Sequence, residues 1–149
     1  MHSSLAYSNP RHKLGLILVD VNRSFFDPDG PFYYPEADKT LIAIGELPGE
    51  VVIPKRRFSA FFATDLALLL QEQGVERLIV AGVKTNVCIR ATVQDAFANG
   101  LRPTIARGSV SSNRSHLHAA SLEDIERYIG EVIDLDTAVD WLRTDGPHD

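Results

Sequence analysis

The sequence predicts an α/β fold: a three-layer, Rossmann-like open parallel sheet with helices on both faces. Short apolar runs, many of them β-branched, alternate along the chain with longer segments of helical periodicity. Uniformly apolar strands are typical of a parallel sheet covered on both faces, and the alternation favours right-handed crossovers between parallel strands. The length of 149 residues suits one domain, which we place at residues 1–149.

Apolar runs mark the predicted strands, at residues 15–19, 51–53, 77–82, 103–106 and 131–135. The first run is continuous and ends at Asp20, which is the pattern of a strand buried on both faces. Residues 1–13 are polar, and we expect them to form a loose N-terminal arm.

The longer predicted helices lie between strands and end at glycine. One spans residues 59–73 before Gly74, and another spans residues 88–99 before Gly100. Ser121-Leu122-Glu123-Asp124 has the form of a capping box, which predicts a helix that extends to residue 129. Shorter helices are predicted at residues 37–44 and 137–142, whereas the proline-rich residues 27–35 form a loop.

Composition and charge exclude several classes of protein. Lys plus Arg number 15 and Asp plus Glu number 20, and a formal net charge of −5 argues against a nucleic-acid partner. No apolar run approaches the ~20 residues of a membrane helix, and residues 1–10 lack the apolar core of a signal peptide. The single cysteine, Cys88, excludes an internal disulfide and a multi-cysteine metal site. We therefore expect a cytoplasmic protein with no membrane partner.

Candidate reactive residues follow three of the predicted strands. Asp20 and Lys55 come directly after the first two, and Cys88 begins a helix just past the third. Parallel strands bring their carboxyl ends to one edge of a sheet, where sites commonly lie. A thiolate is a nucleophile, a helix N-terminus and an ammonium lower the pKa of a thiol, and a carboxylate moves protons. Backbone N–H groups of residues 83–88 would form an oxyanion hole.

Each of these residues also has a simpler interpretation. A lone cysteine is commonly an inert buried side chain, Asp20 would cap a loop, and Lys55 would be one surface cation beside Arg56 and Arg57. Only their joint placement at strand ends favours the chemical interpretation.

Three segments of the chain resemble the isochorismatase-like cysteine hydrolases, a superfamily that includes nicotinamidases, carbamoylsarcosine amidohydrolases and ureidoacrylate hydrolases. They are residues 16–22 with Phe25-Phe26, residues 55–61 with Thr64-Asp65-Leu66, and residues 82–96, which open with Gly82-Val83-Lys84-Thr85-Asn86-Val87-Cys88. The third segment is the most specific of the three.

The resemblance implies a role for each candidate. Asp20 is the general base and acid, Lys55 is the cation that tunes the site, and Cys88 is the nucleophile. The resemblance also implies a cis peptide bond between Val83 and Lys84, and an oxyanion hole formed by the backbone N–H groups of Lys84 and Cys88.

The interval between Asp20 and Lys55 is shorter than in full-length relatives, which have a long helix and another strand there. That strand carries the Asp-x-His pattern of the nicotinamidase metal site, and no Asp-x-His occurs in this chain. We therefore expect no metal and no cofactor. The gap beside the first strand predicts self-association into a dimer or higher oligomer, with residues 27–48 folding over the gap as the alternative.

The loop after the first strand is expected to overhang the site. Phe26 and Tyr33 are candidate substrate-pocket residues on this loop, with Phe61 and Val83 from the other two segments, and ordinary packing is the alternative role. His116 and His118 lack metal-ligand spacing on a helix, and we expect structural or surface roles for both.

The leading hypothesis is a cysteine-dependent hydrolase of a small amide, carbamoyl or ureide substrate, acting through a covalent thioester intermediate. Two alternatives stay open: an isochorismatase-type vinyl ether hydrolase, which needs no cysteine nucleophile, and a non-catalytic binding or assembly module that kept the fold.

Overall fold

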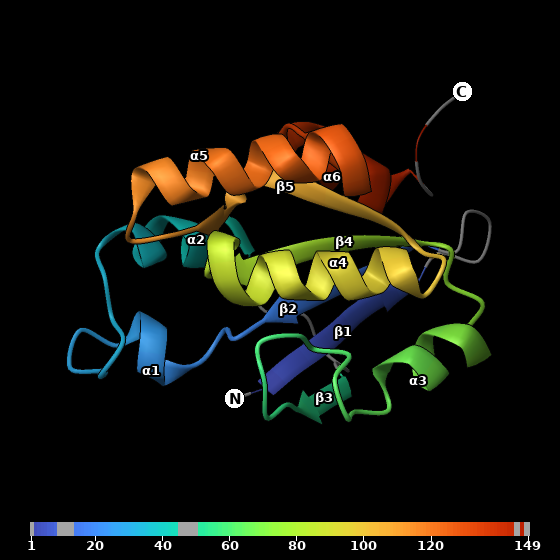
Figure 1. Cartoon of the computed structure of the whole chain (residues 1–149), viewed down its shortest axis with the longest axis horizontal. Helices are drawn as coiled ribbons and strands as arrows, with labels where there is room; N and C mark the ends of the chain where they lie inside the picture. The colour runs from blue at the N-terminus through green and yellow to red at the C-terminus, as the bar shows by residue number, and fades with distance from the viewer. Residues whose placement is uncertain (1, 9–13, 45–50, 145–146, 148–149) are drawn as a thin grey trace.

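The structure is a computed structural model and describes residues 2–8, 14–44, 51–144 and 147. Its middle layer is a six-stranded sheet of order β3-β1-β2-β4-β5-β6 (Figure 1). The strands β2 (Leu14–Val19), β4 (Arg77–Val83), β5 (Arg102–Ser111) and β6 (Glu131–Ile133) are parallel to one another. With helices packed around these parallel strands, the predicted α/β class is confirmed.

The N-terminal segment corrects one expectation. Strand β1 (His2–Ser8) pairs antiparallel with β2 and also with β3 (Val51–Pro54), so it is an interior strand of the sheet. The prediction of a loose arm over residues 1–13 is therefore wrong for residues 2–8, and residues 9–13 lie outside the described part of the chain. A strand that is joined to its neighbours through backbone hydrogen bonds needs no apolar run, so composition did not reveal it.

Helices cover both faces of the sheet, as predicted. One face, which includes Ile17 and Val80, packs against α3 (Leu66–Glu72), α4 (Arg90–Ala98) and α5 (Ser115–Asp124). The opposite face, which includes Leu18 and Ile79, packs against α6 (Leu135–Arg143). This division follows from the alternation of side chains along each strand.

In its described residues, the interval between Asp20 and Lys55 contains the helices α1 (Arg23–Phe26) and α2 (Glu36–Ile44). Ahead of α2, Tyr34 forms a 2.9 Å hydrogen bond between its hydroxyl and Ser111 Oγ, and Thr40 of α2 donates to the same oxygen at 2.7 Å. Helix α2 therefore packs at the end of β5. The edge of β2, where the short interval predicted a gap, is paired with β1.

Two predicted helix starts are wrong. Residues 59–65 are irregular and α3 begins at Leu66, because Thr64 bonds locally: its hydroxyl donates to Ala60 O at 2.6 Å and accepts from Leu66 N. Ser121 is buried inside α5, which begins at Ser115, so the predicted capping box is not a helix start. The chain continues from α5 through the π-helical turn η2 (Ile125–Ile129).

Candidate active site

The structure brings Asp20, Lys55 and Cys88 together. Lys55 Nζ lies 2.8 Å from Asp20 Oδ2 and donates to Cys88 Sγ at 3.8 Å. The side chains of Asp20 and Lys55 are fully buried, and Cys88 is 5% exposed. A carboxylate, an ammonium and a thiol therefore share one small region that is nearly closed to solvent.

Strand direction explains how residues so far apart in sequence meet. Strands β2 and β3 are both antiparallel to β1, so they point the same way, and β4 is parallel to β2. Asp20, Lys55 and the turn that carries Cys88 follow β2, β3 and β4 respectively, and all three reach the same edge of the sheet.

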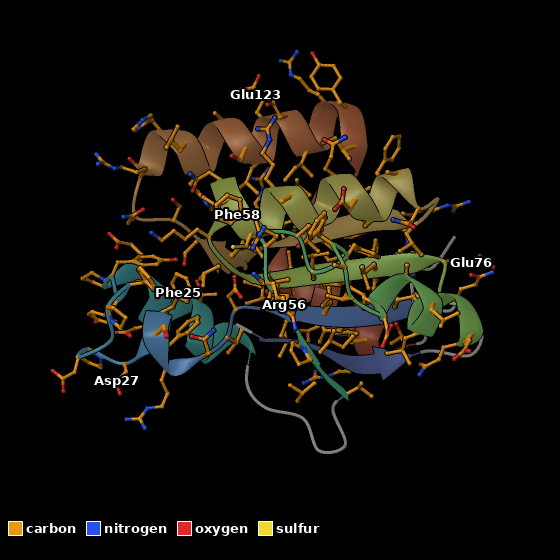
Figure 2. All side chains as sticks on the ribbon, turned by 60° about the horizontal axis from the view of Figure 1, so that its bottom comes forward. Phe25, Asp27, Arg56, Phe58, Glu76 and Glu123 are labelled. Atoms are coloured by element: carbon orange, nitrogen blue, oxygen red, sulfur yellow. The ribbon has the colours of Figure 1, made fainter. Side chains whose placement is uncertain are left out.

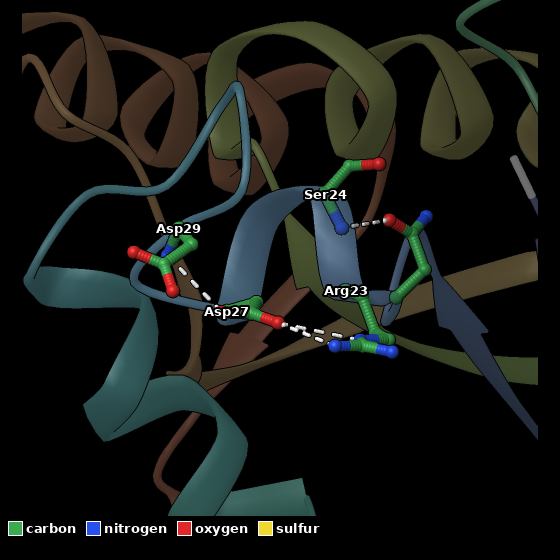
Figure 3. A network of polar contacts seen from close by, with 5 residues as sticks. Arg23, Ser24, Asp27 and Asp29 are labelled. Carbon is green, nitrogen blue, oxygen red and sulfur yellow. Dashed lines mark hydrogen bonds and ion pairs between the residues drawn. The ribbon is translucent and has the colours of Figure 1, made fainter.

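Asp20 has a left-handed backbone conformation, with φ of 56°, directly before a tight turn. Asn22 N donates to Asp20 O at 2.9 Å, and the Asn22 side chain caps α1 by accepting from Ser24 N (Figure 3). In the same figure Asp27 accepts from Arg23 and from Asp29 N, and both contacts lower the pKa of the Asp27 carboxyl. These local contacts fix the path of the chain as it leaves Asp20.

The segment after β3 holds Lys55 against the rest of the site. Lys55 Nζ donates to Arg57 O at 2.9 Å, and Ala60 N donates to the buried Thr92 Oγ1 of α4 at 3.0 Å. Arg56 and Phe58 of this segment, labelled in Figure 2, are both exposed, Phe58 by 61%. The backbone bond to Thr92 ties the lysine segment to the helix that follows Cys88.

Cys88 lies in the π-helical turn η1 (Thr85–Ile89), which follows the end of β4. Gly82 has φ of 120°, and a Cβ there would lie 2.0 Å from Val19 O, so only glycine permits this close approach of β4 to β2. The Val83–Lys84 peptide bond is cis, as the resemblance implies. Val87 N and Ile89 N both donate to Lys84 O, at 3.0 and 3.1 Å.

The pKa of Cys88 is shifted in the direction opposite to the sequence-based expectation. The pKa of the thiol is raised to about 12, first by burial and then by the nearby Asp20 carboxylate. The Lys55 ammonium and the Lys84 backbone N–H lower it, with smaller effect. The expectation of a lowered pKa was wrong because the cation is neutralised by its carboxylate partner inside a desolvated site.

The four candidate pocket residues have varied environments. Val83 is fully buried against Phe25 and Tyr34, and Phe26 packs on the same cluster. Phe61 belongs to the main core, and the hydroxyl of Tyr33 donates to Asp38 Oδ2 at 2.9 Å. These contacts are ordinary packing and surface contacts, and a role in binding substrate stays a prediction.

Sequence reasoning missed the contacts that surround the Cys88 turn. Thr85 Oγ1 lies 2.8 Å from His118 Nδ1, and Ser112 Oγ donates to Asn86 Oδ1 at 2.6 Å. A hollow of about 290 Å³ lies beside them. Its lining residues are Glu36, Val110, Ser111, Ser112, Asn113, Ser115 and His118. Of these residues, the sequence patterns single out His118 alone.

A nicotinamidase-type metal ion does not fit the described part of the chain. Within residues 2–8, 14–44, 51–144 and 147, no group of three or more His, Cys, Asp or Glu side chains is placed to hold a metal ion. Across the same residues, no helix is both long and apolar enough to cross a membrane.

Comparison with known proteins places the chain in a family. The Isochorismatase domain model matches residues 34–137, which include Lys55 and Cys88. The chain belongs to the isochorismatase family. Asp20 precedes the matched region of this family member, so its place in the site rests on the geometry described above.

Curated relatives of this isochorismatase-family chain include two amidohydrolases. Maleamate amidohydrolase of Pseudomonas putida is 43% identical over 101 residues, which cover 68% of this chain and 47% of that protein. N-carbamoylsarcosine amidase of Arthrobacter is 39% identical over 99 residues, which cover 66% of this chain and 38% of that protein. The match thus spans less than half the length of either relative.

Among solved structures, the cysteine hydrolase of Pseudomonas syringae pv. phaseolicola has a TM-score of 0.80 at 17% identity. The match covers 94% of this chain and 97% of that chain. At this identity the similarity shows a shared fold over nearly the whole of the isochorismatase-family chain.

Proposed function

We propose that this isochorismatase-family protein is a cysteine-dependent hydrolase of a small amide, carbamoyl or ureide substrate. The observation that carries the proposal is the convergence of Asp20, Lys55 and Cys88, with Lys55 Nζ within 2.8 Å of the carboxylate and 3.8 Å of the thiol. The two curated relatives, both named for amide hydrolysis, support the reaction class.

The first half of the reaction forms a thioester. Asp20 accepts the proton of the Cys88 thiol, and the sulfur attacks the carbonyl carbon of the substrate. The negative oxygen of the tetrahedral intermediate is stabilised by the backbone N–H groups of Lys84 and Cys88. When the C–N bond breaks, Asp20 returns its proton to the departing nitrogen, and the acyl group stays on Cys88.

The second half releases the acid. Asp20 accepts a proton from water, the hydroxyl oxygen attacks the thioester carbonyl, and the C–S bond breaks. The proton returns to the sulfur, which restores the thiol and the carboxylate. Throughout, the Lys55 ammonium balances the charge of the buried carboxylate.

Two features of the site support proton transfer through Asp20. A thiol whose pKa is raised to about 12 stays protonated at neutral pH, so attack requires a base within reach. Lys55 Nζ lies between the two groups, 2.8 Å from Asp20 Oδ2 and 3.8 Å from Cys88 Sγ, so the carboxylate is close enough to the thiol to serve as that base. The backbone N–H of Lys84 lowers the pKa of the thiol, which supports its proposed place near the reacting atoms.

A reducing compartment keeps a catalytic thiol available, and we include a cytoplasmic location in the proposal for that reason. The partner in the proposed reaction is a small molecule, and no metal or other cofactor takes part in any step.

The test is ammonia release from a panel of small amides, N-carbamoyl amino acids and ureides, with the intact mass of the protein measured during turnover. We expect turnover of at least one class and an acyl adduct on Cys88. Cys88→Ser and Cys88→Ala should remove turnover without unfolding the protein. Full activity of Cys88→Ala would overturn the covalent mechanism. A vinyl ether is assayed in parallel: its cleavage alone would favour the isochorismatase-type alternative, and turnover of no substrate would favour the non-catalytic one.

A further inference from the structure

We propose that His118 is a positioning residue that holds the Cys88 turn in its reactive shape through Thr85. The inference rests on the proposed hydrolase function and adds a residue to its machinery. His118 lies on α5, outside the three segments that carry Asp20, Lys55 and Cys88, and its ring nitrogen Nδ1 is 2.8 Å from Thr85 Oγ1.

Thr85 is well placed to transmit this contact to the reacting atoms. It is the first residue of η1, follows the proposed oxyanion donor Lys84 directly, and precedes Cys88 by one helical turn. Its side chain has no exposure to solvent, so its hydroxyl depends on a protein partner. A shift of Thr85 would therefore move both the Lys84 N–H and the Cys88 sulfur.

A second tether acts on the next residue. Ser112 Oγ donates to Asn86 Oδ1 at 2.6 Å, and Ser112 itself is buried at the end of β5. Two successive turn residues, Thr85 and Asn86, are thus held by side chains of α5 and of the connection that precedes it. The contacts made by Ser112 and His118 are side-chain bonds, so single substitutions can remove them while the backbone keeps its path.

The charge state of His118 suits a hydrogen bond to a hydroxyl. Burial and the positive charge of Arg107 both lower the pKa of the imidazole, which keeps the ring neutral near neutral pH. A neutral ring either donates from Nδ1 or accepts there, so it can pair with the Thr85 hydroxyl in both orientations. Nothing in this arrangement requires His118 to touch substrate.

The experiment compares His118→Ala with His118→Asn, whose amide places a polar atom near the position of Nδ1. His116→Ala is the matched control, because His116 lies on the same helix and is exposed. We expect His118→Ala to lower kcat roughly tenfold or more with KM within about twofold, since misplaced reacting groups slow chemistry without weakening binding. His118→Asn should recover most of the rate, and His116→Ala should match the wild type.

Hydrogen exchange of the amides of residues 84–89, measured without substrate, gives a readout that does not depend on turnover. We expect about fivefold faster exchange in His118→Ala, the loss of a typical hydrogen bond, and near wild-type exchange in His118→Asn. Thr85→Val should accelerate exchange similarly, and the double variant Thr85→Val/His118→Ala should add little to either single change.

Unchanged exchange and unchanged kcat in His118→Ala would overturn the proposal. A rise in KM at constant kcat would also overturn it, because that result would make His118 a substrate-binding residue in the neighbouring hollow. If the wild type hydrolyses none of the amides tested, the proposed function fails, while the exchange measurement still decides whether His118 holds the turn.

Discussion

Lys55 Nζ lies 2.8 Å from Asp20 Oδ2, and neither side chain has any exposure to solvent. Removing two charges from water is costly, and the attraction between them commonly offsets that cost without exceeding it. The pair therefore offers little net gain in stability, and the proposed function gives it a role in proton transfer at the adjacent Cys88. This interpretation predicts different outcomes for single and double substitutions.

Substitution of one partner should destabilise the fold strongly. Asp20→Asn leaves the ammonium buried without its counter-ion, and we expect a loss of about 3–5 kcal/mol in the free energy of unfolding measured with urea. Asp20→Asn/Lys55→Met removes both charges and should recover much of that loss while remaining inactive. Glu123→Gln, which breaks the exposed pair with Arg127, is the control and should leave the urea midpoint unchanged. A double variant as unstable as Asp20→Asn would contradict this account.

The thiol itself gives a second prediction. Because the pKa of Cys88 is raised to about 12, alkylation by iodoacetamide should be slow at pH 8 and keep increasing beyond pH 10, whereas a free cysteine levels off above its pKa of about 8.5. The chain has a single cysteine, so the label reports on Cys88 alone.

Variants of the two neighbouring charges should change that alkylation rate in opposite directions. Asp20 raises the thiol pKa and Lys55 lowers it, so Asp20→Asn should speed alkylation and Lys55→Met should slow it. Simple loosening of the fold would speed both reactions, so opposite signs separate the electrostatic effect from unfolding. An inflection near pH 8.5 in the wild type would contradict the raised pKa.

The strands that surround the site were predictable for a physical reason. Strands β2 and β4 are buried on both faces and therefore read as continuous apolar runs, and the carboxyl-end rule for parallel strands brings the residues after them to one edge. Strand β1 was not predictable in this way, because His2–Ser8 is not a continuous apolar run and its pairing with β3, at residues 51–54, depends on a segment remote in sequence.

Some properties of the site residues are likewise predictable from local sequence, and others depend on the fold. The local sequence marks Cys88 and Lys55 as candidates, but the sign of the thiol pKa depends on the distance of Asp20 and on burial, which no local pattern contains. His118 and Thr85 are 33 positions apart, and no local sequence pattern around either residue predicts their contact. A hydrogen bond between two side chains so far apart in sequence can be recognised only once the fold is known.

Metal content provides a third prediction. The Asp-x-His pattern is missing from the sequence, so the protein purified without added metal should contain no stoichiometric transition metal and should keep its activity in EDTA. Elemental analysis before and after chelation is the measurement. A stoichiometric metal that is lost together with activity would show that other residues form a metal site.

The N-terminal strand gives a fourth prediction. Strand β1 lies between β2 and β3, so it connects the strand that ends at Asp20 with the strand that ends at Lys55. Deletion of residues 1–8 should leave β3 without its pairing strand and should cut turnover by at least an order of magnitude through misplacement of Lys55. Hydrogen exchange of residues 51–57 should rise in the deletion variant, while that of residues 90–98 in α4 should change little. Full activity of the deletion variant would show that Lys55 is held by other contacts.

The last prediction concerns self-association. The structure indicates a different contact surface, on β3, from the one beside the first strand that the sequence predicts. Strand β1 pairs with the edge of β2, so the gap that predicted an oligomer from the sequence is occupied within the chain. Exposed apolar side chains occur instead on β3 and the segment after it, where Val52 is 58% exposed and Phe62 is 57% exposed. In the sheet order β3 is the terminal strand beside β1, and such edges pair readily with another chain.

We expect a dimer or higher oligomer by light scattering at low micromolar concentration, with β3 at the contact. Val52→Lys should shift the mass towards one chain, because a lysine on an edge strand opposes pairing with a second strand. Tyr128→Lys is the matched control. Tyr128 is 71% exposed on η2, which precedes β6 at the opposite edge of the sheet from β3. Its substitution should leave the mass unchanged. A mass of one chain at every concentration, with full activity, would show that the protein works as a monomer.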